Sequence, residues 1–231
     1  MFETVAPTYD VQNRLLSVGR DRAWRRTFVE RLRLPPGSVV GDLAVGTADI
    51  AIATCERYPG VSVVGVDLSP GMMRVARRKI SARGLQGMIQ LRQGDLRELP
   101  LGDSTLDAIT LCFGIRNILD RRAVLAECCR VLKPGGSVRI MEMVMPEAAV
   151  VRALYGWYFD NVMPLAGNLM SRTDYAYSYL RHSILEFPTD AEFLGLMREA
   201  GFERAGASPI SWGMAKIYDA RKPRSRGAPW K

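Results

Sequence analysis

A glycine turn followed some twenty residues later by a carboxylate is the feature that most constrains this chain. Residues 41–49 read Gly-Asp-Leu-Ala-Val-Gly-Thr-Ala-Asp, so an apolar run ends at Gly46 and leads into a helix-like segment. Residues 63–67, Val-Val-Gly-Val-Asp, form a second apolar run that ends in Asp67. This order is typical of two adjacent parallel strands that hold a nucleotide, because glycine admits a ligand close to the backbone and a carboxylate binds a ribose diol. The simpler interpretation is an ordinary strand–helix–strand unit with a tight turn.

Composition favours one α/β domain in a reducing compartment. The 231 residues are 48% hydrophobic, enough for one full-sized core. The net charge of +8 favours acidic partners such as RNA, an anionic membrane surface or an anionic substrate, although a solvated basic surface is the commonest explanation of such a charge. Four cysteines without a Cys-x-x-Cys pair, and the single His182, predict free thiols and no metal site. No signal peptide or membrane span is visible, so we expect a cytoplasmic protein.

Apolar runs and helical periodicity alternate through the middle of the chain. We expect strands at 38–45, 61–67, 88–93, 106–112 and 136–143, and helices at 48–57, 70–83 and 121–132. Ser69-Pro70 is a typical helix start, and Lys133-Pro134-Gly135-Gly136 a typical stop. A further helix from Thr189 to Ala200 precedes a strand pair at 202–210 and 212–220. The alternation predicts an α/β fold with a mostly parallel sheet, helices on both faces and a C-terminal antiparallel strand pair.

Three segments lie outside this alternation. Residues 1–35 form a helical preface, and residues 146–187 an insertion rich in aromatic residues and methionine. The insertion is a candidate lid or apolar substrate wall, or simply the core of a helical layer. We assign residues 1–223 to a single domain and 224–231 to a flexible basic tail.

The glycine turn and its carboxylate resemble the S-adenosylmethionine (SAM) pocket of the Rossmann-like class I methyltransferases. The dinucleotide pattern Gly-x-Gly-x-x-Gly is absent. In such a pocket Gly46 leaves room for the ligand, Thr47 offers its hydroxyl or amide, and Asp42 receives the methionyl ammonium. Asp67 binds the ribose, or alternatively caps the helix that starts at Ser69.

Two later strand ends carry polar residues. Asp95 and the amide of Leu96 follow the third apolar segment, where they contact the adenine edge or merely cap a turn. Arg116 and Asn117 follow the fourth strand in an otherwise apolar sequence, and if buried they need partners. They either face the methyl acceptor or serve structure, with Arg116 paired to Asp120.

Motifs along the chain resemble those of the quinone C-methyltransferases, which make menaquinone from demethylmenaquinone and perform the equivalent ring methylation in ubiquinone synthesis. The resemblance covers roughly residues 2–223. Its most specific motifs are Phe2-x-x-Val5-Ala6-Pro7-x-Tyr9-Asp10, Trp24-Arg25, Phe113-Gly114-Ile115-Arg116-Asn117 and Arg130-Val131-Leu132-Lys133-Pro134-Gly135-Gly136.

The resemblance implies a SAM-dependent C-methyltransferase that acts on a prenylated quinol, most simply demethylmenaquinol, without a metal. It assigns cofactor contacts to Thr47, Asp67, Leu68, Asp95, Leu96 and Cys112, and the acceptor site to Arg116 and Asn117. It also implies substrate contacts at Tyr9, Arg20, Tyr155, Tyr158 and Met163.

Two positions depart from the family pattern. Ala48 stands where the family usually has the last glycine of Gly-Thr-Gly, and Cys112 replaces a usual serine. If position 48 needs a positive φ, alanine costs about 1 kcal/mol or more there. A thiol is also a weaker hydrogen-bonding group than a hydroxyl.

The mechanism that follows gives Arg116 the main role. Its guanidinium stabilises the acceptor phenolate and positions a water that takes the proton, and Asn117 orients the same hydroxyl or water. The basic preface, with Arg20, Arg22, Arg25 and Arg26, is a candidate contact with anionic lipid at the inner face of the membrane.

Other functions remain open on the sequence. The chain could methylate another small hydrophobic acceptor, such as a polyketide or sterol-like molecule, or act as a non-enzymatic SAM-binding scaffold. RNA methylation is disfavoured, because no stacking platform and no Asn-Pro-Pro-Tyr motif is present. The choice between naphthoquinol and benzoquinol, and homodimerisation, are not decided by the sequence.

Overall fold

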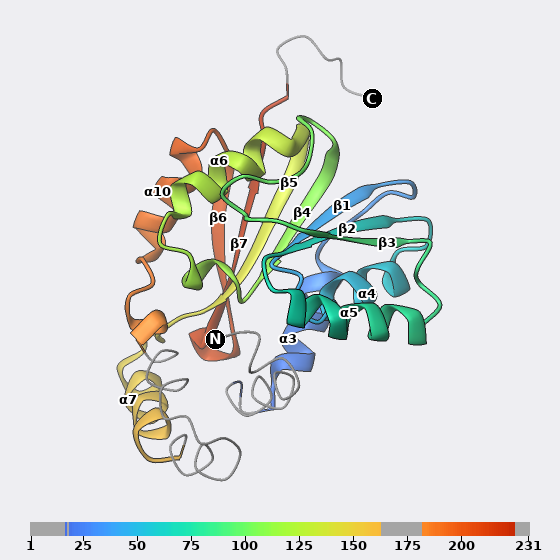
Figure 1. Cartoon of the computed structure of the whole chain (residues 1–231). Coiled ribbons are helices and arrows are strands. Elements are labelled where there is room, and N and C mark those ends of the chain that lie inside the picture. The colour runs from blue at the N-terminus through green and yellow to red at the C-terminus, as the bar shows by residue number, and fades with distance from the viewer. Residues whose placement is uncertain (1–16, 18, 163–181, 225–231) are drawn as a thin grey trace.

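The fold is built around a seven-stranded sheet (Figure 1). The computed structural model describes residues 17, 19–162 and 182–224. The strands are β1 (Val39–Leu43), β2 (Ser62–Asp67), β3 (Ile89–Gln93), β4 (Leu106–Cys112), β5 (Leu132–Met143), β6 (Glu203–Ile210) and β7 (Ala215–Arg221). Their order is β3-β2-β1-β4-β5-β7-β6, and β7 alone runs antiparallel to its neighbours. The predicted α/β fold is therefore confirmed, including the C-terminal antiparallel pair.

Helices cover both faces of the sheet (Figure 1). One face carries α4 (Asp49–Arg57) and α5 (Pro70–Ala82), with α3 (Asp21–Glu30) beside them; the other carries α6 (Arg121–Val131) and α10 (Asp190–Glu199). Local signals set the helix starts. The Ser69 hydroxyl accepts the Met72 amide at 3.3 Å with Pro70 in the first turn, and Thr189 forms a capping box with Glu192. Both predicted starts are confirmed.

Three apolar clusters hold these layers together. The largest packs α6 and α10 against β1, β4, β5 and β7, and a second packs α4 and α5 on β1 and β2. The third joins α3 to the carboxyl end of β5 and to α7 (Ala149–Trp157), through side chains such as Trp24, Phe28, Met141 and Tyr155. This third cluster therefore anchors the helical preface and the insertion at one end of the sheet.

Two boundaries differ from the prediction. β5 begins at Leu132, because Leu132 pairs with Leu106 before the register shifts, so Lys133–Gly136 belongs to the strand rather than to a turn ahead of it. Trp212 lies in a short 3-10 turn, Ser211–Gly213, and β7 starts only at Ala215. Local turn chemistry marked both places, but strand pairing decided where each strand begins.

The insertion is helical where the structure describes it. α7 continues into a π-helical segment, Tyr158–Val162. The predicted substrate contacts Tyr9 and Met163, and most of the predicted tail, lie outside the described residues. Within residues 17, 19–162 and 182–224, no helix is long and apolar enough to cross a membrane.

Candidate functional site

Two adjoining cavities open at the carboxyl ends of the parallel strands. The larger, of about 380 Å³, is lined by residues that follow four successive strand ends: Ala44, Gly46, Asp67, Leu68, Met72, Asp95, Leu96, Arg97, Cys112, Phe113, Gly114, Asn117, Ile118 and Leu119. The smaller, of about 30 Å³, shares Ala44, Gly46, Cys112 and Phe113 with it and extends to Arg25, Asp42, Val45, Thr47, Asp49 and Ile50. β1 lies between β2 and β4, so the cavities sit at the point where the strand order reverses, the usual ligand crevice of such sheets.

The backbone around the shared rim is strained. Gly46 has φ +54°, and a Cβ there would meet only the carbonyl oxygen of Ala44, at 3.9 Å, so the turn leaves open space beside it. Ala44, Ala48 and Phe113 also have positive φ, at 52°, 66° and 58°. The positive φ at Ala48 confirms the strain expected of that substitution. Left-handed conformations of residues with side chains persist where the surrounding fold enforces them, often at binding sites.

Asp42 places a buried carboxyl beneath the glycine turn. Its side chain is 2% exposed, and Oδ1 accepts the hydroxyl of Thr110 on β4 at 2.8 Å. Oδ2 makes no hydrogen bond of ordinary geometry with the described part of the chain. Burial raises the pKa of Asp42 to about 7, against the lowering effect of the Thr110 hydroxyl and the Ala51 amide. The group is poised to ionise when a cation binds beside it.

Asp67 joins the glycine turn to the start of α5. Its Oδ2 accepts the Gly46 amide at 2.8 Å and its Oδ1 accepts the Ser69 amide at 2.9 Å. Burial raises the pKa of this carboxyl, and these backbone hydrogen bonds oppose that shift. Asp67 therefore fixes the turn and also lines the larger cavity, so the two roles considered from the sequence are compatible.

Asp95 lies across the same cavity and is held by Arg97. The Arg97 guanidinium donates to both carboxylate oxygens, the shorter contact being 2.6 Å, and this pair keeps the pKa of Asp95 below its usual range. The Asp95 side chain also accepts the Arg97 amide at 2.9 Å, so it caps a turn as well as lining the cavity.

Arg25 reaches the smaller cavity from α3, which corrects its predicted place on a lipid-facing surface. Its side chain is 14% exposed and pairs with Asp49, the first residue of α4. Lys79 of α5 binds the same carboxylate at 2.8 Å and the Thr47 hydroxyl at 3.1 Å. Arg25 Nε is buried and has no partner within the described residues. Packing of α3 on α4 thus turns this cation inward, towards the glycine turn.

Arg116 forms a buried ion pair that the sequence did not suggest. Its Nη1 donates to Glu142 Oε1 at 2.6 Å and to the Phe113 carbonyl at 2.9 Å. Glu142, on β5, is fully buried and also accepts the Arg116 and Met143 amides. The alternative prediction, an ion pair between Arg116 and Asp120, is wrong: Asp120 instead caps α6 by accepting the Ala123 amide.

Arg116 and Asn117 face different surroundings, although they are neighbours in sequence. They lie in one 3-10 turn, Ile115–Asn117, in which successive side chains point about 120° apart. Asn117 lines the larger cavity, and its Oδ1 is buried without a partner in the described chain. Arg116 is not among the residues that line either cavity. The two residues therefore reach different sides of the turn.

On the Arg116 side the insertion supplies an apolar wall. Tyr155 of α7 is buried against Phe159, with ring centroids 4.8 Å apart, and its hydroxyl has no partner among the described residues. Burial raises the pKa of Tyr155 despite the nearby Arg116 cation. Tyr158 packs at the edge of the same cluster. Arg20 lies elsewhere, with its guanidinium 4.7 Å from the ring centroid of the exposed Trp212.

The structure thus gathers all eight predicted cofactor residues, from Asp42 to Cys112, around two joined cavities. Sequence analysis missed Glu142 and Thr110 and misplaced Arg25. A carboxylate inside the apolar strand Arg139-Ile140-Met141-Glu142 was the available signal for Glu142. For Arg25 the available signal was its place in the Trp24-Arg25 motif of the family resemblance, which separates it from the other arginines of the segment. Within the described residues, no group of histidine, cysteine or acidic side chains is arranged to hold a metal ion.

Comparison with known proteins identifies the family. A model described as the ubiE/COQ5 methyltransferase family matches residues 1–222. The chain belongs to this family. It is 39% identical to the ubiquinone/menaquinone biosynthesis C-methyltransferase UbiE of Geotalea daltonii, over 96% of this chain and 94% of that one. It is 40% identical to the demethylmenaquinone methyltransferase of Thermus thermophilus, over 96% of this chain and all of that one.

A solved SAM-dependent methyltransferase from Aquifex aeolicus has the same fold as this member of the ubiE/COQ5 family. The TM-score is 0.62 at 16% identity, and the match covers 85% of this chain and 88% of that one. The predicted family and the predicted class I methyltransferase fold are both confirmed, and the protein is a methyltransferase that uses SAM.

Proposed function

We propose that this ubiE/COQ5 family member transfers a methyl group from SAM to a ring carbon of a prenylated quinol, converting demethylmenaquinol to menaquinol. The observation that carries the proposal is the joined pair of cavities beneath the Gly46 turn, with Asp67 on one side and the Arg116 turn on the other. The Thermus thermophilus relative named demethylmenaquinone methyltransferase supports a naphthoquinol acceptor.

The chemistry of the lining fits SAM. The ribose diol is matched by the Asp67 carboxylate at the end of β2, and the adenine edge by Asp95 and the Leu96 amide. The ammonium of the amino-acid end is matched by Asp42 Oδ2, which has no hydrogen bond of ordinary geometry with the described residues, and its carboxylate by Arg25 Nε. Buried polar atoms without a hydrogen bond are rare because each lost hydrogen bond is costly. The unpaired Asp42 Oδ2 and Arg25 Nε therefore favour a ligand whose zwitterionic amino-acid end lies in the smaller cavity.

Bound SAM supplies an electrophilic methyl group. The protein must raise the electron density of the acceptor ring, whose carbon is a weak nucleophile until a hydroxyl is deprotonated. A guanidinium stays protonated and is no base, so Arg116 stabilises the phenolate and positions the water that takes the hydroxyl proton. Once the methyl group is on the ring carbon, that carbon loses its own proton to water and the ring becomes aromatic again. The ion pair with Glu142 holds Arg116 in one orientation. Asn117, which belongs to the same turn and lines the larger cavity, orients the hydroxyl near the methyl donor.

Methyl transfer measured side by side on two acceptors tests the proposal. Purified protein with SAM is given reduced demethylmenaquinone or the ubiquinone precursor, and methylated product is quantified by mass spectrometry. We expect faster turnover of the naphthoquinol. Product from neither quinol, or from an unrelated small hydrophobic acceptor instead, contradicts the proposal. SAM binding by titration separates loss of the acceptor function from loss of the cofactor site.

We further propose that α7 rests on the membrane in which the prenyl tail of the acceptor lies. Val150, Leu154 and Trp157 occupy one stripe of this helix, at i, i+4 and i+7, and are 72%, 64% and 60% exposed. The opposite side of α7 carries Tyr155 into the apolar cluster beside Arg116. A helix that is apolar on its outer stripe as well as its inner one is suited to a lipid interface.

The membrane proposal predicts that a change in α7 affects long-tailed and short-tailed substrates differently. The double variant Leu154→Ser/Trp157→Ser should lose activity on a long-tailed quinol in vesicles and keep it on a short-tailed, water-soluble quinol. The short-tailed substrate serves as the internal control for folding and catalysis. Equal loss on both substrates would exclude a lipid-contacting role for this stripe.

A further inference from the structure

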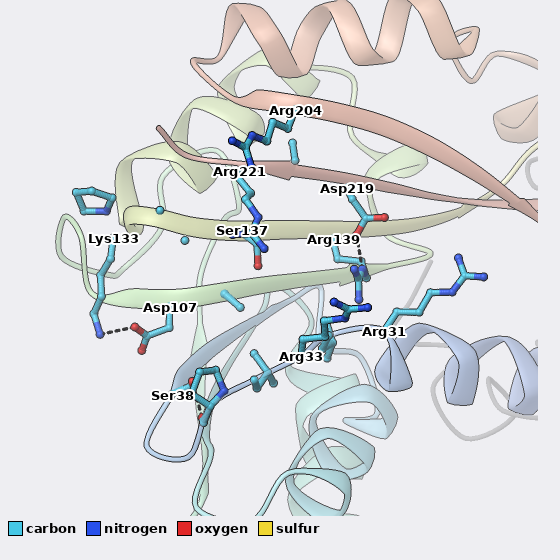
Figure 2. Close-up of a pocket in the computed structure, with 18 of the residues that line it drawn as sticks. Arg31, Arg33, Ser38, Asp107, Lys133, Ser137, Arg139, Arg204, Asp219 and Arg221 are labelled. Carbon is cyan, nitrogen blue, oxygen red and sulfur yellow. Dashed lines mark hydrogen bonds and ion pairs between the residues drawn. The ribbon is translucent and has the colours of Figure 1, made fainter. Parts of the chain in front are cut away.

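A further, strongly basic cavity, drawn in Figure 2, lies at the amino ends of β4 and β5, whereas the methyl-transfer site lies at the carboxyl ends of the parallel strands. It has a volume of about 980 Å³ and is bounded by the chain between α3 and β1 on one side and by β4, β5, β6 and β7 on the other. Seven arginine or lysine side chains and three aspartate or glutamate side chains line it, so the lining carries a net charge of +4. Half of the chain's excess positive charge of +8 is therefore gathered here.

The alternation of β5 and β7 creates the floor of this cavity. Val138, Ile140, Tyr218 and Ala220 are buried in the core on one face of the sheet. On the other face Ser137 pairs with Arg221 across the two strands, and Arg139 with Asp219. Such a pattern is typical of a sheet face that meets solvent. Here the segment Arg31–Pro35 lines the other side of the cavity.

Four of the seven cations that line this cavity are not neutralised by the described residues. Lys133 is paired with Asp107 at 2.8 Å, and Arg139 with Asp219, as the dashed lines in Figure 2 show. The guanidinium groups of four others, Arg31, Arg33, Arg204 and Arg221, make no ion pair or hydrogen bond within the described residues. Nη1 of Arg139 is also buried without a partner in the described chain. These donors enter the cavity from the loop after α3 and from three neighbouring strands.

Backbone strain singles out two of these arginines. Arg33 and Arg204 both have φ +52°, in the left-handed region where an L residue costs about 1–2 kcal/mol relative to the right-handed form. These two strained arginines line the same cavity, and their guanidinium groups have no ion pair or hydrogen bond with the described residues that would offset this cost. Strain of this kind is a reason to look for a bound ligand.

We propose that this cavity binds a soluble oligophosphate, such as inorganic tripolyphosphate or the phosphate chain of a nucleotide. Guanidinium groups form paired, charge-assisted hydrogen bonds to phosphate oxygens, and several converging arginines match a chain of linked phosphates better than a single ion. The concave shape favours a discrete ligand over a flat lipid surface. Among the described residues, no aromatic side chain lines the cavity, which disfavours single-stranded nucleic acid because such sites stack bases on aromatic rings.

Calorimetric titration of the full-length protein at low salt tests this inference, with tripolyphosphate, ATP, AMP, orthophosphate and sulfate as probes. We expect tripolyphosphate to bind and orthophosphate and sulfate to bind much more weakly. ATP binding as tightly as tripolyphosphate, with AMP inactive, would identify the phosphate chain as the recognised part; tighter binding of ATP would add a nucleoside contact.

The double variant Arg204→Gln/Arg221→Gln should weaken tripolyphosphate binding by roughly tenfold or more, because charged hydrogen bonds are lost. Arg77→Gln/Arg78→Gln is the matched control, since it removes two exposed arginines of α5 outside the cavity. Arg33→Gly should also lose affinity while the melting temperature of the free protein is kept or raised, which a purely structural arginine would not allow.

Three results would overturn the inference. The first is the absence of tripolyphosphate binding by the wild-type protein, and the second is an equal loss of affinity in the control variant. The third is binding to phosphatidylglycerol vesicles that depends on Arg204 and Arg221 while tripolyphosphate neither binds nor competes, which would make the surface a membrane contact instead. SAM affinity and methyl transfer should be unchanged in all these variants, because the cavity lies away from the glycine turn.

Discussion

Separating the structural from the catalytic role of Arg116 is the sharpest test of the site. Arg116 is 8% exposed and its partner Glu142 is fully buried, with 2.6 Å between Nη1 and Oε1. Removing one member of a buried pair leaves the other charge without compensation and costs about 3–5 kcal/mol. For a chain of this length each kcal/mol lowers the melting temperature by about 2–4 °C, so Arg116→Met should lower it by roughly 6–20 °C.

The double variant Arg116→Met/Glu142→Gln removes both charges. We expect it to recover much of the lost stability, with a coupling free energy of about 1–3 kcal/mol between the two positions. Thermal unfolding of the wild type, both single variants and the double variant gives this coupling directly. If the stability losses of the two single variants sum to that of the double variant within about 0.5 kcal/mol, the ion pair is refuted as a source of stability.

Turnover of the same four proteins gives the second half of the test. If Arg116 stabilises the phenolate, the double variant regains stability but not the rate of methyl transfer, while its affinity for SAM stays near that of the wild type. Glu142→Gln keeps the guanidinium and should retain more activity than Arg116→Met. A stable double variant that methylates the quinol at the wild-type rate would remove Arg116 from the mechanism and leave it a purely structural role.

Three further predictions concern the cofactor site. Asp67→Asn should weaken SAM binding by at least about tenfold in titration, since a charged hydrogen-bond acceptor for the ribose is lost; unchanged affinity would exclude the ribose contact. Arg25→Ala should weaken binding of SAM but not of 5′-methylthioadenosine, which lacks the amino-acid end, and equal weakening of both would point to a general disturbance of the turn. Burial raises the folded-state pKa of Asp42 to about 7, above its unfolded value near 3.9, so the folded protein binds the extra proton between these values and its stability falls as pH rises through them. The free energy of unfolding, measured with denaturant, should fall less between pH 5 and pH 8 for Asp42→Asn than for the wild type. Identical falls in the two proteins would mean that another group titrates.

Local sequence signals predicted most of the fold. Ser69-Pro70 and Thr189 with Glu192 start helices through contacts within four residues, so their effect is visible in any short window. The glycine turn at Gly46 and the carboxylate at Asp67 are similarly local, because each marks a strand end. Their mutual contact, Gly46 amide to Asp67 carboxylate, follows once the two strands are known to be adjacent and parallel.

The partners of the charged side chains could not be predicted in this way. Arg116 binds Glu142, 26 residues away on the next strand of the sheet, and local spacing suggested Asp120 instead. Arg25 reaches Asp49 only because α3 packs on α4. Ion pairing depends on distance in space, which hydropathy patterns do not encode beyond the neighbouring turn of a helix or the facing residue of a strand.

By itself the sequence determined the order of strands and helices, the family and the residues at the strand ends, because backbone conformation and hydrophobic periodicity are set by near neighbours. Only the tertiary structure decided which side chains meet. It separated Arg116 from Asn117, turned Arg25 towards the glycine turn, and brought Arg33, Arg204 and Arg221 to one cavity from segments up to about 190 residues apart. Charges scattered through a sequence acquire a common function only when folding places them around the same space.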